Sequence, residues 1–332
     1  MKNLFLTILI GIISTSIYAQ DNSSTIMFYN VENLFDTIND PLIRDDDFTP
    51  EGKKKWTTER YQKKLNDLAK VISSIDNESL PSLVGFAEIE NKVVLEDLIK
   101  TDYLNSQNYQ IVHEESPDVR GIDVGLIYNP DDFTYLSHQK IRIPLDTEYK
   151  VRDILYVKGI LYNKDTLHIF INHWKSRSGG QTETEPQRIQ CAKTLRNSVD
   201  SILAINKEAK ILIMGDLNDE PQDSSIFKTL KANNSYEQNS LYNVMLKLSK
   251  EGFGSHNYRG HWNMLDNIIV SNNLVDSKDL DVSENTGHIF SPEWITYSNK
   301  SGNKSPNRTY GGSNYYGGYS DHYPVYVILK MQ

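Results

Sequence analysis

Two short motifs place acidic, amide and imidazole side chains directly beside apolar segments of the chain. The motif Gly215-Asp216-Leu217-Asn218-Asp219 follows one apolar segment, and Ser320-Asp321-His322 precedes another. We expect both segments to be β-strands, so that each motif lies at a strand end. If the two ends meet, carboxylates, a carboxamide and a histidine surround one point. Such a set suits a hard divalent cation and a phosphate, because Mg²⁺ prefers oxygen ligands and usually takes only one or two from protein carboxylates.

Four further segments also concentrate polar groups at expected strand ends. One such segment would be weak evidence, because a strand that ends in Asp or Asn is common turn chemistry. Six in one chain favour a shared site. The four further segments are Tyr29-Asn30-Val31-Glu32-Asn33, Ala87-Glu88-Ile89-Glu90-Asn91, Arg120-Gly121-Ile122-Asp123 and Asn172-His173-Trp174-Lys175-Ser176-Arg177.

The residue types favour Mg²⁺, Mn²⁺ or Ca²⁺ as the metal. The strand-end histidines, His173 and His322, form no pair at helical spacing, and the chain has one cysteine. Zinc is therefore the lesser interpretation, and a set dominated by Asp, Glu and Asn matches the harder cations. The sequence contains no Gly-rich nucleotide loop, Gly-x-Ser-x-Gly elbow or His-Glu-x-x-His motif.

The order of the expected elements favours a layered α/β sandwich. Most strand-like runs are nearly continuous apolar segments, which is typical of strands covered on both faces. Apolar stripes predict one helix that opens at Thr57 and another over 187–206. Strands and helices do not alternate strictly, so two packed sheets are favoured over one doubly wound sheet. The predicted strands are Thr25–Asn30, Leu83–Ile89, Val124–Tyr128, Asp153–Leu161, Leu167–Asn172, Ile211–Met214, Asp266–Val270 and Val325–Leu329.

Residues 291–319 are rich in Ser, Asn, Gly and Tyr, and we expect them to form a long surface loop. Loops of this length in a compact domain tend to be functional or mobile. The tyrosines of the loop could line a cleft or lie in solvated turns. They are Tyr310, Tyr315, Tyr316 and Tyr319.

The first residues have the pattern of a secretory signal peptide. A charged Lys2, an apolar run over 4–13 and small residues up to Ala19 follow in that order. The run is short for a membrane anchor, so we predict that 1–19 is a signal peptide and 20–332 a single domain. The protein would then be exported, either periplasmic or secreted, with no stable membrane insertion. Its one cysteine, Cys191, excludes an intramolecular disulfide, so a full-sized core must provide the stability.

The net charge of −9 argues against a protein that holds nucleic acid by electrostatics alone, because such proteins are usually basic. A hydrolase is still compatible with this charge, since carboxylates around a metal contribute to it and cations mask them. No feature of the sequence indicates oligomerisation, and we expect a monomer.

The motifs resemble those of the endonuclease/exonuclease/phosphatase superfamily, the metal-dependent phosphoesterases that include pancreatic-type deoxyribonuclease and abasic-site endonucleases. The resemblance keeps the family order over nearly all of 20–332. Its most specific parts are Gly215-Asp216-Leu217-Asn218 and Ser320-Asp321-His322. The segments 172–177 and Arg308-Thr309-Tyr310 are similar to a bacterial exported branch. The resemblance implies a four-layer α/β sandwich with its site at one edge of two packed mixed sheets.

The resemblance also implies roles for individual residues. Glu88 would be the main metal carboxylate, with Asn30 and Glu32 beside it and Asp321 as a further carboxylate. Physical chemistry supports such a site, because phosphodiester hydrolysis needs an aligned water and positive charge where negative charge grows. Asp216 would orient or deprotonate the attacking water, and Asn218 would hold a phosphate oxygen. His322 would contact the phosphate, supported by Asp266. His173 would be the second histidine of the site, held by Asp123.

The general base stays open between Asp216 and a histidine, with Asp216 preferred. On the substrate side, Asn172, Lys175 and Arg177 are the candidates for gripping phosphate. Arg188 is either a further phosphate contact or part of a solvated helix face.

We therefore expect an exported metal-dependent phosphodiesterase, a nuclease that acts on DNA and also, as an open alternative, on RNA. The second hypothesis within the same fold is a phosphatase or phosphodiesterase for a small or lipid-linked phosphate. A non-catalytic binding protein on this scaffold would have lost central residues, whereas Asn30, Glu88, Asp216, Asn218, Asp321 and His322 are all present.

Overall fold

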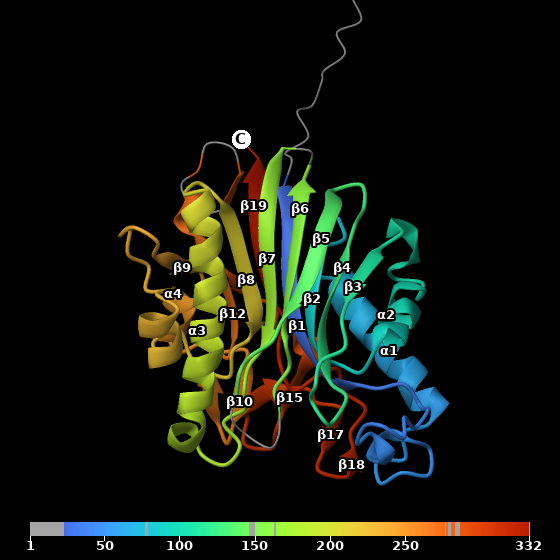
Figure 1. Ribbon diagram of the computed structural model, residues 1–332. Helices are drawn as coiled ribbons and strands as arrows, with labels where there is room; N and C mark the ends of the chain where they lie inside the picture. Colours follow the sequence, from blue (N-terminus) through green and yellow to red (C-terminus); the bar gives the residue numbers. More distant parts are fainter. Residues whose placement is uncertain are drawn as a thin grey trace, which may run out of the picture.

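Two large β-sheets stacked face to face form the centre of the protein (Figure 1). A computed structural model describes residues 23–76, 79–145, 150–162, 164–275, 277, 280–282 and 286–331. The predicted signal peptide, residues 1–19, lies outside this described part. Within the described part, no helix has both the length and the apolar character needed to cross a membrane.

The first sheet, called sheet A, is mixed. Its described strands, in sheet order, are β13 (Leu280–Val282), β19 (Val325–Met331), β1 (Ser23–Leu34), β2 (Leu83–Ile89), β4 (Asp123–Tyr128) and β3 (Gln110–His113), with β14 (His288–Ile289) also paired to β19. β1 and β2 run parallel, and the other pairs are antiparallel.

The second sheet, called sheet B, is mixed as well. Its described strands, in sheet order, are β5 (Phe133–Ile141), β6 (Ile154–Leu161), β7 (Asp165–His173), β8 (Lys210–Asp216), β12 (Asp266–Ser271) and β9 (Leu241–Asn243). β7 and β8 run parallel, and the other pairs are antiparallel.

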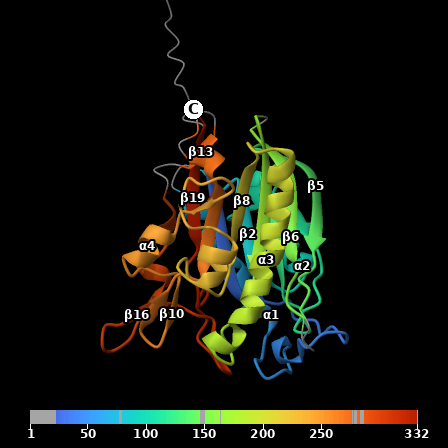
Figure 2. The ribbon, with the colours of Figure 1, turned by 60° about the vertical axis from the view of Figure 1, so that its left-hand side comes forward.

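Helices cover the outer faces of both sheets, and short hairpins lie at one end of the sandwich. The α-helices are α1 (Thr58–Ser73), α2 (Lys92–Ile99), α3 (Gln181–Ile205) and α4 (Leu246–Lys250). Shorter helical turns cover Asp46–Phe48, Asn105–Gln107, Ser225–Thr229, Asn272–Leu274 and Glu293–Ile295. The hairpin strands are β10 (His256–Tyr258) with β11 (His261–Asn263), β15 (Thr296–Ser298) with β16 (Lys304–Pro306), and β17 (Tyr310–Gly311) with β18 (Asn314–Tyr315). Figure 2 shows α4 on the side of the sandwich away from β5.

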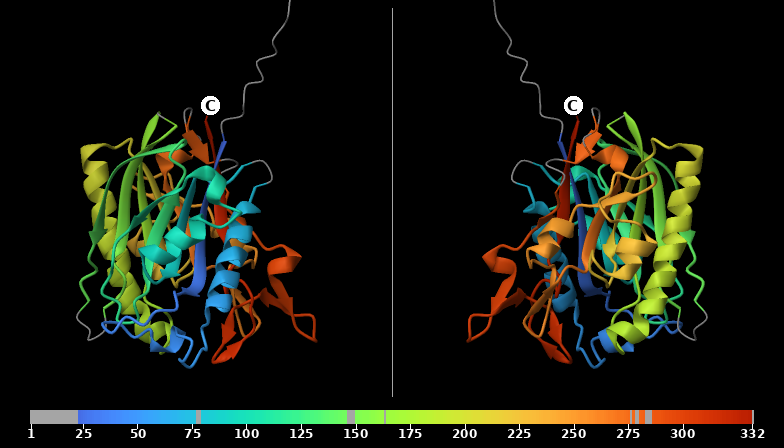
Figure 3. Two further views of the ribbon diagram at one scale, coloured as in Figure 1. Left: turned by 90° about the vertical axis from the view of Figure 1, so that its right-hand side faces the viewer. Right: turned by 90° about the vertical axis from the view of Figure 1, so that its left-hand side faces the viewer.

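The strands are apolar on both faces because each sheet lies between two layers. Along β1, Ile26 and Phe28 pack into the core between the sheets, whereas Met27 and Tyr29 pack with α1 and α2. On sheet B, Phe170 and Ile213 pack with α3 in a third cluster. Figure 3 shows the helices on the two outer sides. The predicted fold class, two mixed sheets flanked by helices, is therefore confirmed.

The predicted strands all coincide with observed ones, but other elements were missed. The polar edge strand β5 has no apolar run to reveal it, because most of its residues are exposed. α2 was missed, and Asn91, which was grouped with the polar strand-end residues, caps it by accepting a bond from the Val94 N–H at 3.1 Å. α3 begins at Gln181 rather than 187, so Pro186 lies inside its second turn.

The register of the strands brings the chemical residues to one end of the sandwich. Because β7 and β8 are parallel and β12 is antiparallel to β8, His173 pairs with Asp216 and Asp216 with Asp266. β19 begins at Val325, just after the His322 motif, and runs to Met331 at the opposite end of the sandwich (Figure 1). Side chains from distant parts of the chain therefore converge where the two sheets end.

His168, on β7, provides a test of how burial sets stability against pH. Burial, followed by nearby Lys158, lowers the pKa of His168 from 6.5 to about 4, and its Nδ1 lies 2.8 Å from the Tyr156 hydroxyl. The folded state disfavours the charged ring, so the contribution of His168 to the free energy of unfolding is full above its ordinary pKa and is lost as the pH falls from 6.5 toward 4.

We expect His168→Gln to remove part of this acid sensitivity. Since the ring is partly exposed, the wild type should lose on the order of 1 kcal/mol more free energy of unfolding than the variant between pH 7 and pH 4.5. Urea denaturation of both proteins at the two pH values measures the difference. Equal losses in the two proteins would contradict the prediction.

Candidate active site

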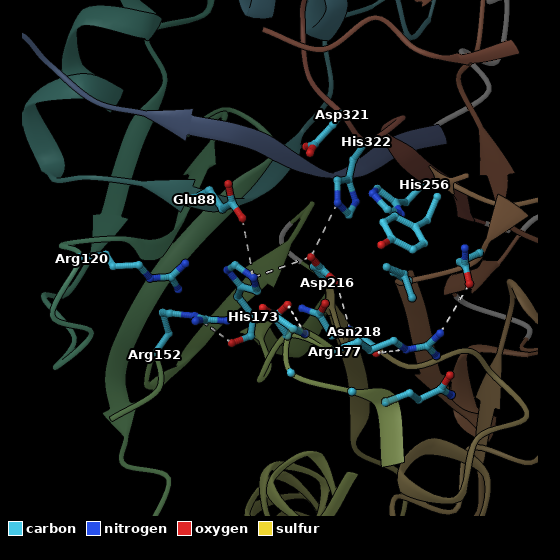
Figure 4. Close-up of a pocket in the computed structure, with 18 residues that line it drawn as sticks. Glu88, Arg120, Arg152, His173, Arg177, Asp216, Asn218, His256, Asp321 and His322 are labelled. Carbon is cyan, nitrogen blue, oxygen red and sulfur yellow. Dashed lines mark hydrogen bonds and ion pairs between the residues drawn. The ribbon is translucent and has the colours of Figure 1, made fainter. Parts of the chain in front are cut away.

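A cavity of about 750 Å³ opens where the two sheets end (Figure 4). It is lined by seven of the residues predicted from the sequence and by several that were not predicted. The predicted residues in its wall are Glu88, His173, Arg177, Asp216, Asn218, Asp321 and His322. The others include Arg120, Arg152, His256, Tyr258, Asn263, Ser176, the loop residues 178–180 and Gln181 at the start of α3.

The carboxylate of Asp216 lies at the centre of the cavity wall, and its residue is 2 % exposed. It accepts hydrogen bonds from Asn30 Nδ2 and the Asn218 N–H, both at 3.0 Å. His173 Nε2 and His322 Nε2 lie 3.7 and 4.0 Å from Asp216 Oδ2. Burial raises the pKa of Asp216 to about 7, although His322 opposes this.

Gly215 lets the Asp216 strand lie close against its neighbour. A Cβ at this position would overlap the carbonyl oxygen of Asn172 on β7. Asn218, two residues after Asp216, has a φ of 51°, in the left-handed region that asparagine tolerates better than most residues. The Gly-Asp-Leu-Asn motif therefore combines close strand packing with a sharp turn that carries the Asn218 amide into the cavity wall.

The surroundings of His322 favour its charged form. Its Nδ1 lies 2.6 Å from Asp266 Oδ2, and both residues are buried. Burial alone would lower the pKa of His322, but the carboxylates of Asp266, Asp216 and Asp321 outweigh it and raise the pKa well above the usual value. Donor atoms of Asp216, Asp266 and His322 lie within 4.8 Å of one another, and we attribute this grouping to the ion pair rather than to a metal site.

The surroundings of His173 favour its neutral form, in contrast to those of His322. Burial, together with the positive charges of Arg152, Arg120 and His322, lowers its pKa well below the usual value. Its Nε2 faces Asp216 and also lies 3.9 Å from Glu88 Oε1. Among the described residues, its Nδ1 has no hydrogen-bond partner. Asp216 thus lies between two imidazoles (Figure 4), and their surroundings shift the two pKa values in opposite directions.

Glu88 projects into the cavity from an irregularity in β2. The pairing of β2 with β4 shifts between Ala87 and Ile89, and Glu88 has a φ of 65°. A non-glycine residue in the left-handed region is uncommon and often marks a functional position. Glu88 Oε2 accepts the Asn33 N–H at 3.0 Å, which fixes the carboxylate.

Glu88 and Asp321 fit a divalent cation. Burial, followed by the charge of Asp321, raises the pKa of Glu88, so the two carboxylates repel each other across the cavity. Their side chains are 18 % and 24 % exposed. Two oxygen donors whose repulsion a cation would relieve are suitable ligands for a hard metal.

Two arginines that were not among the predicted site residues, Arg120 and Arg152, form one side of the cavity. The carboxylate of Asp118 accepts from Arg120 Nε at 3.1 Å and from Arg152 at 3.0 Å. Arg152 is buried and also donates to the His173 carbonyl at 3.1 Å, whereas the Arg120 side chain is 52 % exposed. Arg120 opened one of the polar segments noted in the sequence, but Arg152 lies in a loop with no such pattern.

The structure corrects the predicted support of His173 by Asp123. Asp123 does not line the cavity, and its carboxylate lies 3.1 Å from His113 Nε2 and accepts the Ser116 N–H at 2.9 Å. Asn172 is also outside the cavity wall, because it is fully buried and its Oδ1 accepts the Trp174 indole N–H at 3.1 Å. Lys175 does not line the cavity either.

Glu32 is turned toward the loop before the final motif. Its two carboxylate oxygens accept the N–H groups of Thr309 at 2.6 Å and Tyr310 at 3.0 Å, and burial raises its pKa to about 7. Asn30 does not line the cavity, but its side-chain amide donates a hydrogen bond to Asp216, which does. Of the four predicted metal residues, Glu88 and Asp321 are therefore the ones that face the cavity directly.

Arg177 and Arg188 have acidic partners. Arg177 lines the cavity, but its guanidinium donates to Asp223 and to the Asn218 carbonyl, each at 2.7 Å. Arg188 is fully buried, with its Nε 2.7 Å from Asp219. Both alternatives for Arg188, phosphate contact and solvated helix face, are wrong.

The tyrosines of the 291–319 loop do not line this cavity. Tyr310 is buried and packs against Trp56 and Phe48, and Tyr315 packs on Tyr310 with ring centroids 5.3 Å apart. Tyr316 is exposed.

Comparison with protein families assigns the chain to a known family. Residues 25–331 match the family described as the Endonuclease/Exonuclease/phosphatase family. The chain belongs to this family. It is therefore a metal-dependent phosphoester hydrolase, as the resemblance implied. The search of curated proteins gave no significant match.

Several solved structures share the fold over nearly the whole chain. TDP2 of D. rerio with a single-strand DNA product is 16 % identical, with a TM-score of 0.56 over 93 % of this chain and 99 % of that one. The human Nocturnin catalytic domain with bound sulfate is 16 % identical, with a TM-score of 0.57 over 93 % and 95 %. A mannosyl-6-phosphatase of Bacteroides thetaiotaomicron is 14 % identical, with a TM-score of 0.56 over 92 % and 99 %. These identities establish a common fold.

A buried lysine holds the loop that leads to Asp321 and His322. Lys64 of α1 is 2 % exposed, and its Nζ donates to Thr309 Oγ1 at 2.6 Å and to the Tyr319 carbonyl. Burial lowers the pKa of Lys64 to about 8, although the charges of Glu32 and Asp321 oppose this shift.

We expect Lys64→Met to lower the free energy of unfolding by about 2–4 kcal/mol, because buried oxygen acceptors lose their donor. The matched control is Lys63→Met. Lys63 is the next residue, but its side chain is 50 % exposed and pairs with Asp67, so its loss should cost less than about 1 kcal/mol. Urea denaturation of the three proteins measures both values, and equal effects of the two substitutions would contradict the prediction.

Proposed function

We propose that the protein is an exported, monomeric phosphodiesterase that hydrolyses nucleic acid, with DNA as the main substrate and RNA as a further one. The observation that carries the proposal is the position of the buried Asp216 carboxylate, 3.7 Å from His173 Nε2 and 4.0 Å from His322 Nε2. The surroundings lower the pKa of His173 and raise the pKa of His322. Export is supported by the sequence pattern of residues 1–19 alone.

The metal would be held by Glu88 and Asp321, with the Asn30 carboxamide nearby. We propose Mg²⁺, with Mn²⁺ or Ca²⁺ as alternatives, because the donors are oxygen atoms. When bound, the cation would neutralise phosphate charge and polarise the phosphorus–oxygen bonds as a Lewis acid. Asn33 would keep the Glu88 carboxylate oriented through its backbone N–H.

Asp216 is the proposed general base toward the attacking water. A pKa of about 7 matches a base that works near neutral pH, and the bonds from Asn30 and Asn218 hold one orientation of the carboxylate. The Asn218 amide also donates to the Trp174 carbonyl at 3.2 Å, which positions it to hold a phosphate oxygen.

His322 is the proposed donor to the phosphate. Asp266 keeps its Nδ1 occupied, so the proton on Nε2 faces the cavity, where negative charge grows during the reaction. His173 stays neutral and can bond a phosphate oxygen without competing for the metal-side carboxylates. Arg120 adds positive charge beside Glu88.

A second candidate is a phosphatase for a small or lipid-linked phosphate monoester. Arg120 and Arg152 on one side of the cavity would suit the greater charge of a terminal phosphate. The net charge of −9 also disfavours long duplex DNA as a ligand. The chain resembles TDP2 with its DNA product and the mannosyl-6-phosphatase to the same degree, with a TM-score of 0.56 to each, so fold similarity does not separate the two candidates.

A substrate panel with metal add-back separates the two candidates. After EDTA treatment, the purified protein should be inactive, and Mg²⁺ should restore cleavage of plasmid DNA and of bis-p-nitrophenyl phosphate at higher rates than that of p-nitrophenyl phosphate. Asp216→Ala is the blank and should lower turnover by about 10²–10⁴-fold without loss of fold. Faster hydrolysis of the monoester would favour the phosphatase. Intact plasmid DNA and RNA with Mg²⁺, Mn²⁺ and Ca²⁺ would contradict the nuclease proposal.

A further inference from the structure

We propose that Tyr258 forms a subsite on which a base of the nucleic acid stacks, next to the phosphate that is cleaved. This inference rests on the proposed function and names the part of the substrate that the cavity mouth recognises. Tyr258 lines the same cavity as Asp216 and His322, and it is 58 % exposed although it is a large aromatic residue.

The hairpin that carries Tyr258 has a tight turn. β10 and β11 are joined by Arg259 and Gly260, whose φ angles are 53° and 89°. Two successive left-handed residues are typical of the type I′ turn, which matches the twist of the two strands. The Asn257 side chain accepts the Gly260 N–H at 3.0 Å. The ring therefore projects from an ordered ribbon.

The start of β10, at the end of the hairpin away from its turn, is fixed to the residues around His322. His256 forms a β-bridge with His322, and their ring centroids are 4.7 Å apart. The carbonyl oxygen of Ser255 accepts a hydrogen bond from the Tyr323 N–H at 2.7 Å, and its hydroxyl oxygen accepts one from the Asp266 N–H at 3.2 Å. In Figure 4 the His256 ring lies beside His322.

The other strand of the hairpin is fixed as well. The Trp262 ring stacks on Tyr323 with centroids 5.6 Å apart, and the Asn263 carboxamide oxygen accepts from Arg177 at 3.4 Å. Tyr258 is thus held at a set position relative to His322, so a group that stacks on its ring has a defined distance to the phosphate at Asp216.

The chemistry of this exposed ring suits a flat π-system. Stacking on an aromatic side chain contributes to the binding of each base and tolerates any base, because every base has a π-face. The Arg259 guanidinium lies 5.1 Å from the Tyr258 ring centroid and adds a cation at the same place. A protein with a net charge of −9 has little overall electrostatic attraction for the phosphates of a nucleic acid. A base that stacks beside the scissile phosphate would therefore supply binding energy that the net charge does not.

The test uses dinucleotides with one phosphodiester bond each. Thymidylyl-thymidine is compared with two analogues in which the thymine on one side or the other is replaced by hydrogen. The wild type with Mg²⁺ should hydrolyse thymidylyl-thymidine with a kcat/KM about tenfold above that of one analogue. In Tyr258→Ala this preference should disappear, mainly through KM, whereas Tyr258→Phe and Tyr258→Trp should keep it.

Tyr236→Ala is the matched control, because Tyr236 is 69 % exposed and does not line the cavity. It should keep the wild-type preference. A wild type that hydrolyses all three dinucleotides equally, or a Tyr258→Ala variant that keeps the preference, overturns the subsite and leaves the nuclease function standing. An equal loss on all three substrates also overturns it, since Tyr258 would then support only the shape of the cavity. Hydrolysis of bis-p-nitrophenyl phosphate without cleavage of any dinucleotide or DNA overturns the proposed function itself.

Discussion

The site depends on one unfavourable condition, the burial of the Asp216 carboxylate among other ionisable groups. A carboxylate out of water must be compensated by hydrogen bonds and opposite charge. Asn30 and Asn218 supply the hydrogen bonds, and the charged His322 supplies the cation. Asp266 stabilises that cation from behind. Each of these residues comes from a different strand end or turn, so the arrangement exists only when both sheets are packed together.

The two sheets divide the chemistry between them. Sheet B carries His173, Asp216 and Asp266 side by side across three neighbouring strands. The β2 irregularity of sheet A brings Glu88 to the cavity, and the loop before β19 brings Asp321. The loop before β19 is fastened by Glu32 and by the buried Lys64. Residues outside the cavity wall therefore hold in place the loop that leads to Asp321 and His322.

Sequence patterns predicted eight strands of the two sheets and several of the residues that line the cavity, because apolar runs covered on both faces are distinctive and the polar motifs lie directly beside them. They did not predict which way a polar side chain turns. Asp123 and Asn172 occupy strand-end positions, yet they bond His113 and Trp174 inside the protein. Arg152 and Tyr258 reach the cavity from a loop and a short hairpin, and such segments lack the periodicity that would place them.

The central claim is that Asp216 lies between one neutral imidazole, that of His173, and one protonated imidazole, that of His322. Nitrogen-15 NMR of the histidine side chains in the metal-free protein tests it most directly, with His322→Gln and His173→Gln used to assign the signals. At pH 7, the account predicts that both ring nitrogens of His322 are protonated and that His173 has one protonated and one free nitrogen. Titration of the two rings together near the ordinary histidine pKa, or a charged His173 beside a neutral His322, would contradict it.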